Sequence, residues 1–80
     1  MSSLQKLQSA FVTAIGAPQN GDFETLVYAQ TNGWDSIAHM TLVNEIEMAF
    51  DIMLDTDDVI DMSSFGKARE ILGKYGVSFS

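Results

Sequence analysis

The 80-residue sequence has no cysteine, one proline, and only four basic residues against eleven acidic ones. The absence of cysteine excludes a disulfide framework, a thiolate metal site and a cysteine nucleophile. It also leaves a reducing cytoplasm as the default compartment. No apolar run approaches the roughly 20 residues of a membrane span, and no signal peptide opens the chain. We therefore expect a cytoplasmic protein that does not insert into a membrane.

The net charge of −7 restricts the expected partners. Such a charge repels phosphate backbones and anionic lipid, so nucleic acid and membrane surfaces are not expected to bind. It favours encounter with proteins that carry Lys/Arg patches. Hydrophobic residues make up 46% of the chain, which is enough for one core, and the length predicts one domain over residues 1–80. We expect this domain to be a monomer.

The first helix is predicted to begin at an N-cap formed by Ser2 or Ser3. It is predicted to end at Gly16 and Pro18, because Gly adopts the left-handed cap and Pro cannot continue the helix. Its apolar residues recur at helical spacing: Leu4, Leu7, Phe11 and Ile15. Residues 18–35 have the composition of a long loop packed onto the domain, with one helical turn near 22–28. Loops of this length in compact domains are often functional.

A second helix is predicted from about residue 35 to residue 50. At 100° per residue its apolar side chains separate into two arcs. One arc is the expected core stripe: Leu42, Val43, Ile46, Ala49 and Phe50. The opposite arc, here called the outer strip, consists of Ile37, Met40, Thr41, Asn44 and Met48. Glu47 and Asp51 flank it. In so small a chain, an apolar arc rimmed by carboxylates predicts a docking surface.

Two further helices are predicted near the C-terminus. Asp55 or Thr56 is expected to cap a short third helix, with Val59 or Ile60 and Met62 facing inward. A calcium loop beginning at Asp55 would need a glycine at its sixth position and a glutamate at its twelfth, and it has neither.

Ser63 and Ser64 are expected to cap the fourth helix, and Gly76 to end it. Its expected core face is Phe65, Ala68, Ile71, Leu72 and Tyr75. The predicted fold is therefore all-α: a small four-helix bundle with three main helices, one short third helix and a long loop between the first two.

Ser36 stands where the long loop enters the second helix. Free backbone N–H groups and the helix dipole favour an attached phosphate there, and Gly33 permits a sharp turn just upstream. The serine could instead merely cap the helix. A hydrolase built on Ser36 and His39 would need an oxyanion hole, a pocket and an orienting acid, and Asp35 cannot easily reach the far nitrogen of His39. We therefore expect no catalytic site and a partly buried His39.

These residues resemble the phosphopantetheine-dependent acyl carrier proteins over nearly the whole chain, from the first helix to about Tyr75. The resemblance centres on Asp35-Ser36-Ile37, which is similar to the family's Asp-Ser-Leu attachment motif. Further matches are Leu42-Val43, Ile46-Glu47, Phe50-Asp51 and the Ser63-Ser64 cap.

The resemblance implies a non-catalytic carrier. A separate phosphopantetheinyl transferase would attach 4′-phosphopantetheine to Ser36, and Asp35 would assist that encounter. Acyl groups would be carried as thioesters on the thiol of this arm, for fatty-acid or polyketide-type biosynthesis. Acyl-loading, condensing and acyl-modifying enzymes would dock their basic patches on the recognition-helix positions: Ile37, Met40, Thr41, Asn44, Glu47 and Met48.

Departures from the family pattern leave alternatives. Thr41 and Met48 replace acids that are common in fatty-acid carriers, whereas Trp34 and His39 look like residues of stand-alone carriers in specialised pathways. An aminoacyl or peptidyl carrier is one alternative, although such carriers often have His at the position of Asp35. The other alternative is an unmodified helical module that binds a partner through the outer strip.

Overall fold

A computed structural model describes residues 2–16, 23–31 and 33–79. The described chain is mostly helical and contains no strand; a single isolated antiparallel bridge joins Val27 to Ser64. The predicted stop at Pro18 lies outside the described residues. The elements are α1 (Ser3–Ile15), the 3₁₀ turn η1 (Phe23–Thr25), α2 (Ser36–Phe50), α3 (Thr56–Asp61) and α4 (Phe65–Lys74).

Local caps define most helix ends, as the sequence predicts. Ser2 accepts a hydrogen bond from Gln5 N–H while the Gln5 side chain accepts one from Ser2 N–H, which completes a capping box at the start of α1. Gly16 ends α1 in the left-handed conformation, with φ 72°. Ser64 caps α4 by accepting a hydrogen bond from Lys67 N–H at 3.0 Å. These interactions satisfy backbone groups that helices leave unpaired at their ends.

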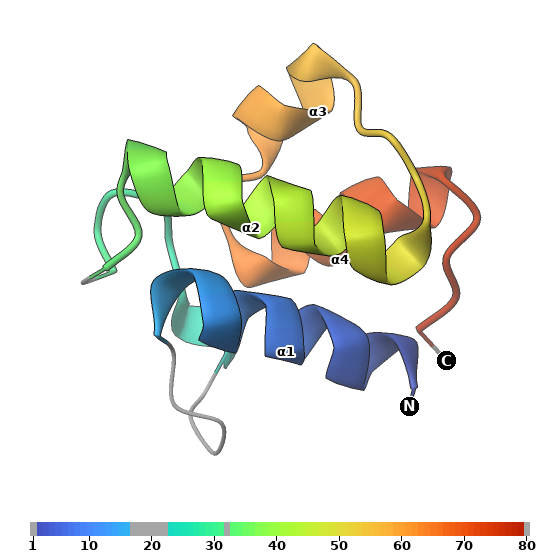
Figure 1. Ribbon diagram of the computed structural model, residues 1–80, viewed down its shortest axis with the longest axis horizontal. Coiled ribbons are helices and arrows are strands. Elements are labelled where there is room, and N and C mark those ends of the chain that lie inside the picture. The colour runs from blue at the N-terminus through green and yellow to red at the C-terminus, as the bar shows by residue number, and fades with distance from the viewer. Residues whose placement is uncertain (1, 17–22, 32, 80) are drawn as a thin grey trace.

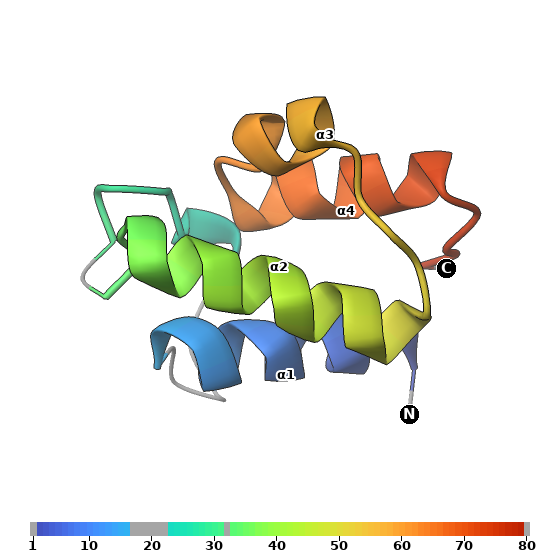
Figure 2. The same cartoon turned by 45° about the horizontal axis from the view of Figure 1, so that its top comes forward.

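Helices α1 and α2 run antiparallel and pack along each other, and α4 lies behind them (Figure 1). Figure 2 shows α3 above α2 and α4, on the side of the molecule away from α1. The connector from the end of α2 crosses to the start of α3 without regular structure. As a result, the first half of α2 lies next to α3, and His39 contacts Val59 although 20 positions separate them in sequence.

The core forms where α1, α2, α4 and the loop before α2 meet. Phe11 lies at its centre, with its ring 5.2 Å from Trp34 and 4.9 Å from Phe65 between centroids. The loop contributes Phe23, which packs 5.2 Å from Phe65. Burying a large apolar side chain stabilises a fold by about 1.5–3 kcal/mol, so the loop is an integral part of the core. The remaining buried apolar residues include Leu7, Ala10, Leu26, Leu42, Ile46, Met62, Ala68, Ile71 and Leu72.

The predicted core stripe of α2 is confirmed for its central residues. Leu42, Val43 and Ile46 are buried, whereas Ala49 and Phe50 are half-buried because they lie at the end of the helix.

In α3, the prediction holds in part. Met62 is buried and Val59 is half-buried, but Ile60 is 75% exposed. Asp55 occupies the N-cap position, yet its side chain makes no capping hydrogen bond. Its backbone N–H instead donates to the Tyr75 hydroxyl at 2.9 Å, so a contact with the end of α4 positions the start of α3.

Candidate functional site

Ser36 is the first residue of α2, and its side chain is exposed. The residue that caps the helix is Asp35, whose Oδ1 accepts a hydrogen bond from Ala38 N–H at 2.9 Å. Within the described part of the chain, the Ser36 hydroxyl takes part in no hydrogen bond. The alternative in which Ser36 serves only as the cap is therefore wrong, since Asp35 already fills that role.

The segment before Ser36 is held tightly against α1. Gly33 has φ 93°, and a Cβ atom at this position would lie 2.8 Å from the carbonyl oxygen of Ile15. The next residue, Trp34, is 1% exposed and packs edge-on against Phe11 and Tyr28. Because Gly33 allows this close approach and Trp34 anchors the chain, the start of α2 has a defined direction.

Both ring nitrogens of His39 are engaged. Trp34 Nε1–H donates to Nδ1 at 3.0 Å, and Nε2 lies 2.8 Å from the carbonyl oxygen of Val59. The indole can only donate and the carbonyl can only accept. His39 is therefore the neutral tautomer with its proton on Nε2, and neither nitrogen is available to take a proton from Ser36. The prediction that His39 is partly buried is confirmed.

A cavity of about 320 Å³ opens beside Ser36, between α2 and α3. Its lining is mainly apolar and includes Ser36 and His39. Sequence periodicity gave no signal for this cavity, because its two walls come from different helices. The lining residues are Tyr28, Ser36, His39, Met40, Val59, Ile60 and Met62.

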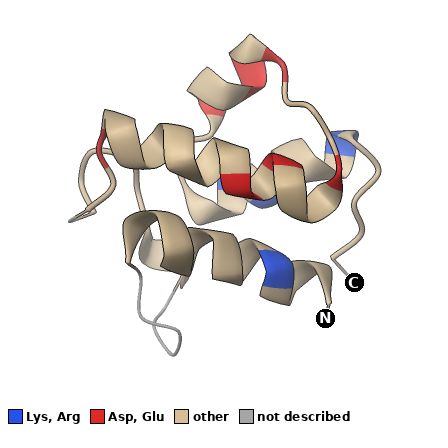
Figure 3. Cartoon of the chain, in the orientation of Figure 1, with Lys and Arg blue, Asp and Glu red and all other residues tan. Residues whose placement is uncertain are grey.

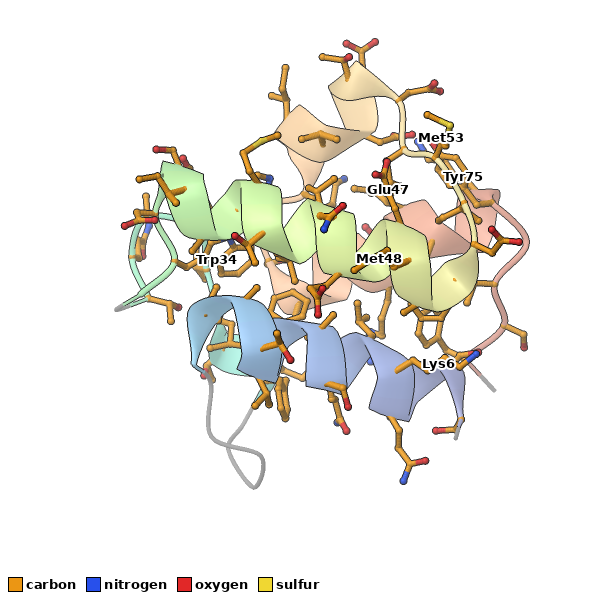
Figure 4. All side chains as sticks on the ribbon, viewed as in Figure 1. Lys6, Trp34, Glu47, Met48, Met53 and Tyr75 are labelled. Atoms are coloured by element: carbon orange, nitrogen blue, oxygen red, sulfur yellow. The ribbon has the colours of Figure 1, made fainter. Side chains whose placement is uncertain are left out.

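The outer strip is exposed, as predicted. Ile37, Met40 and Met48 have exposed fractions of 78%, 62% and 64%, and Thr41 and Asn44 are also exposed. All five residues share one side of α2. Figure 4 shows Met48 on the face of α2 toward the viewer.

Glu47 differs from the other recognition-helix positions. It is half-buried, and its Oε2 accepts a hydrogen bond from Leu54 N–H at 2.9 Å. The side chain points toward the connector that carries Met53, rather than away from the protein (Figure 4). Met53 itself is 84% exposed. Helical periodicity could not identify Met53 as a surface residue, because it lies in irregular structure.

Acidic residues are concentrated on α2, α3 and the connector, whereas the basic residues of the C-terminal part lie on α4 (Figure 3). The cations of α4 form ion pairs with carboxylates of the same chain. Lys67 pairs with Asp61 at 3.4 Å, and Arg69 pairs with Glu24 at 2.7 Å. These pairs leave the carboxylates near the outer strip without a compensating α4 cation.

Asp58 forms the most buried of these pairs. Its two oxygens accept hydrogen bonds from Lys74 Nζ and the Tyr75 hydroxyl, each at 2.6 Å. These bonds, that of Lys74 first, hold the pKa of the Asp58 carboxyl below its ordinary value. The carboxylate in turn raises the pKa of Lys74 and of Tyr75. The cluster ties α3 to the end of α4.

Among the described residues, no three His, Asp or Glu side chains are grouped so that they could hold a metal ion, and this includes the acidic run at 55–58. None of the helices in residues 2–16, 23–31 and 33–79 combines the length and apolar character needed to cross a bilayer.

Comparisons of the chain with models of protein families, with curated proteins and with solved structures found no match.

Proposed function

We propose that the protein is an acyl carrier protein with the architecture of a small four-helix bundle. In this proposal Ser36 carries a 4′-phosphopantetheine group through a phosphodiester, and the protein presents acyl groups to enzymes of fatty-acid or polyketide-type biosynthesis. The protein itself is a substrate and partner of those enzymes and catalyses no reaction.

The observation that carries the proposal is the state of the Ser36 side chain. It is exposed and makes no hydrogen bond within the described chain, while its neighbour Asp35 provides the cap. A serine in the first turn of a helix is usually used as a cap. Here the hydroxyl is exposed, so its oxygen can attack the pyrophosphate of coenzyme A held by a transferase, with adenosine 3′,5′-bisphosphate as the leaving group. It also lies beside first-turn N–H groups and the positive end of the helix dipole, which favour a phosphate.

The residues around Ser36 fit this group. Asp35 fixes the first turn of α2, and Gly33 and Trp34 fix the direction of the chain that enters it. When attached, phosphopantetheine supplies a terminal thiol that holds an acyl group as a thioester. The chain has no cysteine of its own, so no side chain competes for that role.

The outer strip supports the proposed partners. A phosphopantetheinyl transferase, and acyl-loading, condensing and acyl-modifying enzymes, must approach the exposed start of α2. Ile37 and Met40 offer apolar contact next to Ser36, and the net charge of −7 attracts partners with basic patches. The same strip would serve an unmodified interaction module, which is the second candidate function.

Intact mass spectrometry separates the two candidates. The protein is incubated with coenzyme A and several broad-specificity phosphopantetheinyl transferases. A gain of one phosphopantetheine is expected for the wild type and for Ser9→Ala, which removes an exposed serine on α1, and no gain is expected for Ser36→Ala. Circular dichroism checks that all three proteins are folded. If the wild type gains no mass with any of the enzymes, the carrier proposal is refuted and the interaction module is favoured.

Two substitutions of Asp35 can separate its role as the helix cap from the effect of its negative charge. Asp35→Asn keeps a capping oxygen for Ala38 N–H, whereas Asp35→Ala removes it. Loss of an N-cap costs about 1 kcal/mol, so only the alanine variant should be measurably less stable to urea. If Asp35 assists the transferase through its charge, both variants should be modified more slowly than the wild type. Normal modification of Asp35→Asn would restrict Asp35 to a capping role.

Glu47 can be tested in the same way. Glu47→Gln keeps an oxygen acceptor for Leu54 N–H but removes the negative charge. We expect slower acyl loading at low salt, because the charge acts on the encounter rate with a basic partner. Little change in stability is expected, because the glutamine oxygen can still accept from Leu54 N–H. Equal loading rates for the wild type and Glu47→Gln would remove Glu47 from the docking site.

A further inference from the structure

Helix α3 is too short to be stable by itself. It contains six residues and has no side-chain cap at its start. Isolated helices shorter than about 12 residues are marginal even in favourable sequences. Its position therefore depends on contacts with α2 and α4.

On one side, polar contacts with the end of α4 hold the start of α3. Asp58 accepts hydrogen bonds from Lys74 and Tyr75, and the Tyr75 hydroxyl also accepts one from Asp55 N–H. These three contacts form one cluster. They involve the last residues of α4, whereas Ser36 lies at the first turn of α2; Figure 2 shows that these two helix ends lie at opposite ends of the molecule.

On the other side, His39 connects α2 to α3. Its Nε2–H donates to the Val59 carbonyl, and its Nδ1 accepts from Trp34. The planes of the Trp34 and His39 rings differ by 22° with centroids 6.0 Å apart, as expected for a hydrogen bond that lies in the plane of both rings. Tyr28 packs edge-on against the imidazole at 5.0 Å. Because Trp34 is buried, the imidazole is held in one orientation.

The hydrogen bond from His39 to Val59 joins two residues that line the cavity beside Ser36. One wall of the cavity includes Ser36 and His39 from α2, and the other includes Val59 and Ile60 from α3. The length of this single bond therefore limits how far the two walls can separate near Ser36.

We propose that His39 is a positioning residue that couples α3 to the attachment end of α2. Trp34 selects the tautomer with the proton on Nε2, and this proton holds the Val59 carbonyl so that the cavity beside Ser36 stays narrow. Opening of the cavity requires the bond from His39 to Val59 to break. The coupling is a property of the unmodified chain, so it stands or falls independently of any modification at Ser36.

The tautomer can be tested in the unmodified wild-type protein. Two-dimensional NMR correlating ring protons with the nitrogens of His39 should show a protonated Nε2 and an unprotonated Nδ1 at neutral pH. A protonated Nδ1 would overturn the proposal, since the Trp34 indole could not then donate to it.

The coupling is tested with His39→Phe, which makes neither hydrogen bond, and His39→Gln, whose amide can accept from Trp34 and donate to Val59. Amide hydrogen exchange is measured for Val59, whose N–H lies within α3, relative to amides in α1. Loss of one hydrogen bond of ordinary strength should raise the relative exchange of α3 about fivefold in His39→Phe. The indole N–H resonance of Trp34 should shift in the same variant. His39→Gln should restore both measurements toward the wild type.

Tyr75→Phe is the matched control at the contact between α3 and the end of α4. It removes the hydroxyl that contacts Asp58 and Asp55. Exchange in α3 should again increase, but the Trp34 indole resonance should not move. If His39→Phe speeds exchange equally in α1 and α3, or if His39→Gln rescues neither measurement, His39 is only a core residue and the proposal is wrong.

Discussion

Replacement of Gly33 by alanine tests whether the loop before α2 approaches α1 as closely as the structure shows. Gly33 has φ 93°, a conformation that residues with a side chain rarely adopt, and its added Cβ would lie 2.8 Å from the Ile15 carbonyl oxygen. Gly16 provides a matched control. It has a similar positive φ of 72°, but a Cβ built there meets no atom within 4 Å. The two substitutions therefore differ mainly in the steric contact.

The expected losses of stability follow from the positive φ and from the steric contact with Ile15. An alanine with positive φ costs about 1–2 kcal/mol relative to the usual conformation. Forcing extra volume into a packed site costs a further 1–3 kcal/mol or so. Gly16→Ala should therefore lose about 1–2 kcal/mol of unfolding free energy, and Gly33→Ala about 2–5 kcal/mol. A domain of this size has a total stability of only about 4–12 kcal/mol, so the second loss is a large fraction.

Urea unfolding followed by tryptophan fluorescence measures both variants. Trp34 is the sole tryptophan, it is 1% exposed, and it follows Gly33 directly, so its emission reports on the region that changes. Gly33→Ala should also slow modification of Ser36 in the transferase assay, because the start of α2 is redirected. Equal losses of stability in the two variants would refute the close contact with Ile15.

Three further predictions concern the ends of the helices. Asp58 has a lowered pKa, so the stability it contributes is present above the unfolded carboxyl pKa of about 3.9 and is lost as the pH falls through the lower folded value. Urea midpoints should therefore fall less steeply in acid for Asp58→Asn, and an unchanged acid dependence would contradict the assignment. Asp51 ends α2 with φ 54°, so Asp51→Gly should raise the unfolding free energy by about 1 kcal/mol; a loss in thermal or urea unfolding would show that the Asp51 side chain stabilises the cap. Gly73 lies within α4 with no atom within 4 Å of an added Cβ, so Gly73→Ala should gain about 0.5–1 kcal/mol in the same measurement. A loss there would mean that the end of α4 does not tolerate a side chain.

The local signals in the sequence were sufficient for most of the secondary structure. Ser2 and Ser64 are cap residues that stand directly before apolar patterns of helical period, and each occupies an N-cap position. The exposure of Ile37 and Met48 also followed from helical geometry. These predictions succeed because capping and periodicity involve residues within four positions of one another.

Two features of the site could not be predicted from the sequence. Glu47 was expected to face a partner, but the backbone of Leu54 takes one of its oxygens. The link from Trp34 through His39 to Val59 joins residues up to 25 positions apart. Spacing along one helix carries no information about such pairs, because they depend on where a second helix lies.

Composition, caps and helical periodicity were enough to predict that the chain is helical, that a serine stands at the start of the acidic second helix, and that this helix has an apolar outer side. That Asp35 is the cap, which leaves the Ser36 hydroxyl without a hydrogen bond among the described residues, is known from the folded structure. The folded structure also shows the cavity that Ser36 lines and the hydrogen bond from His39 to Val59 beside it. The division has a physical cause: helices and caps are local interactions, whereas a cavity exists only between elements that the whole fold brings together.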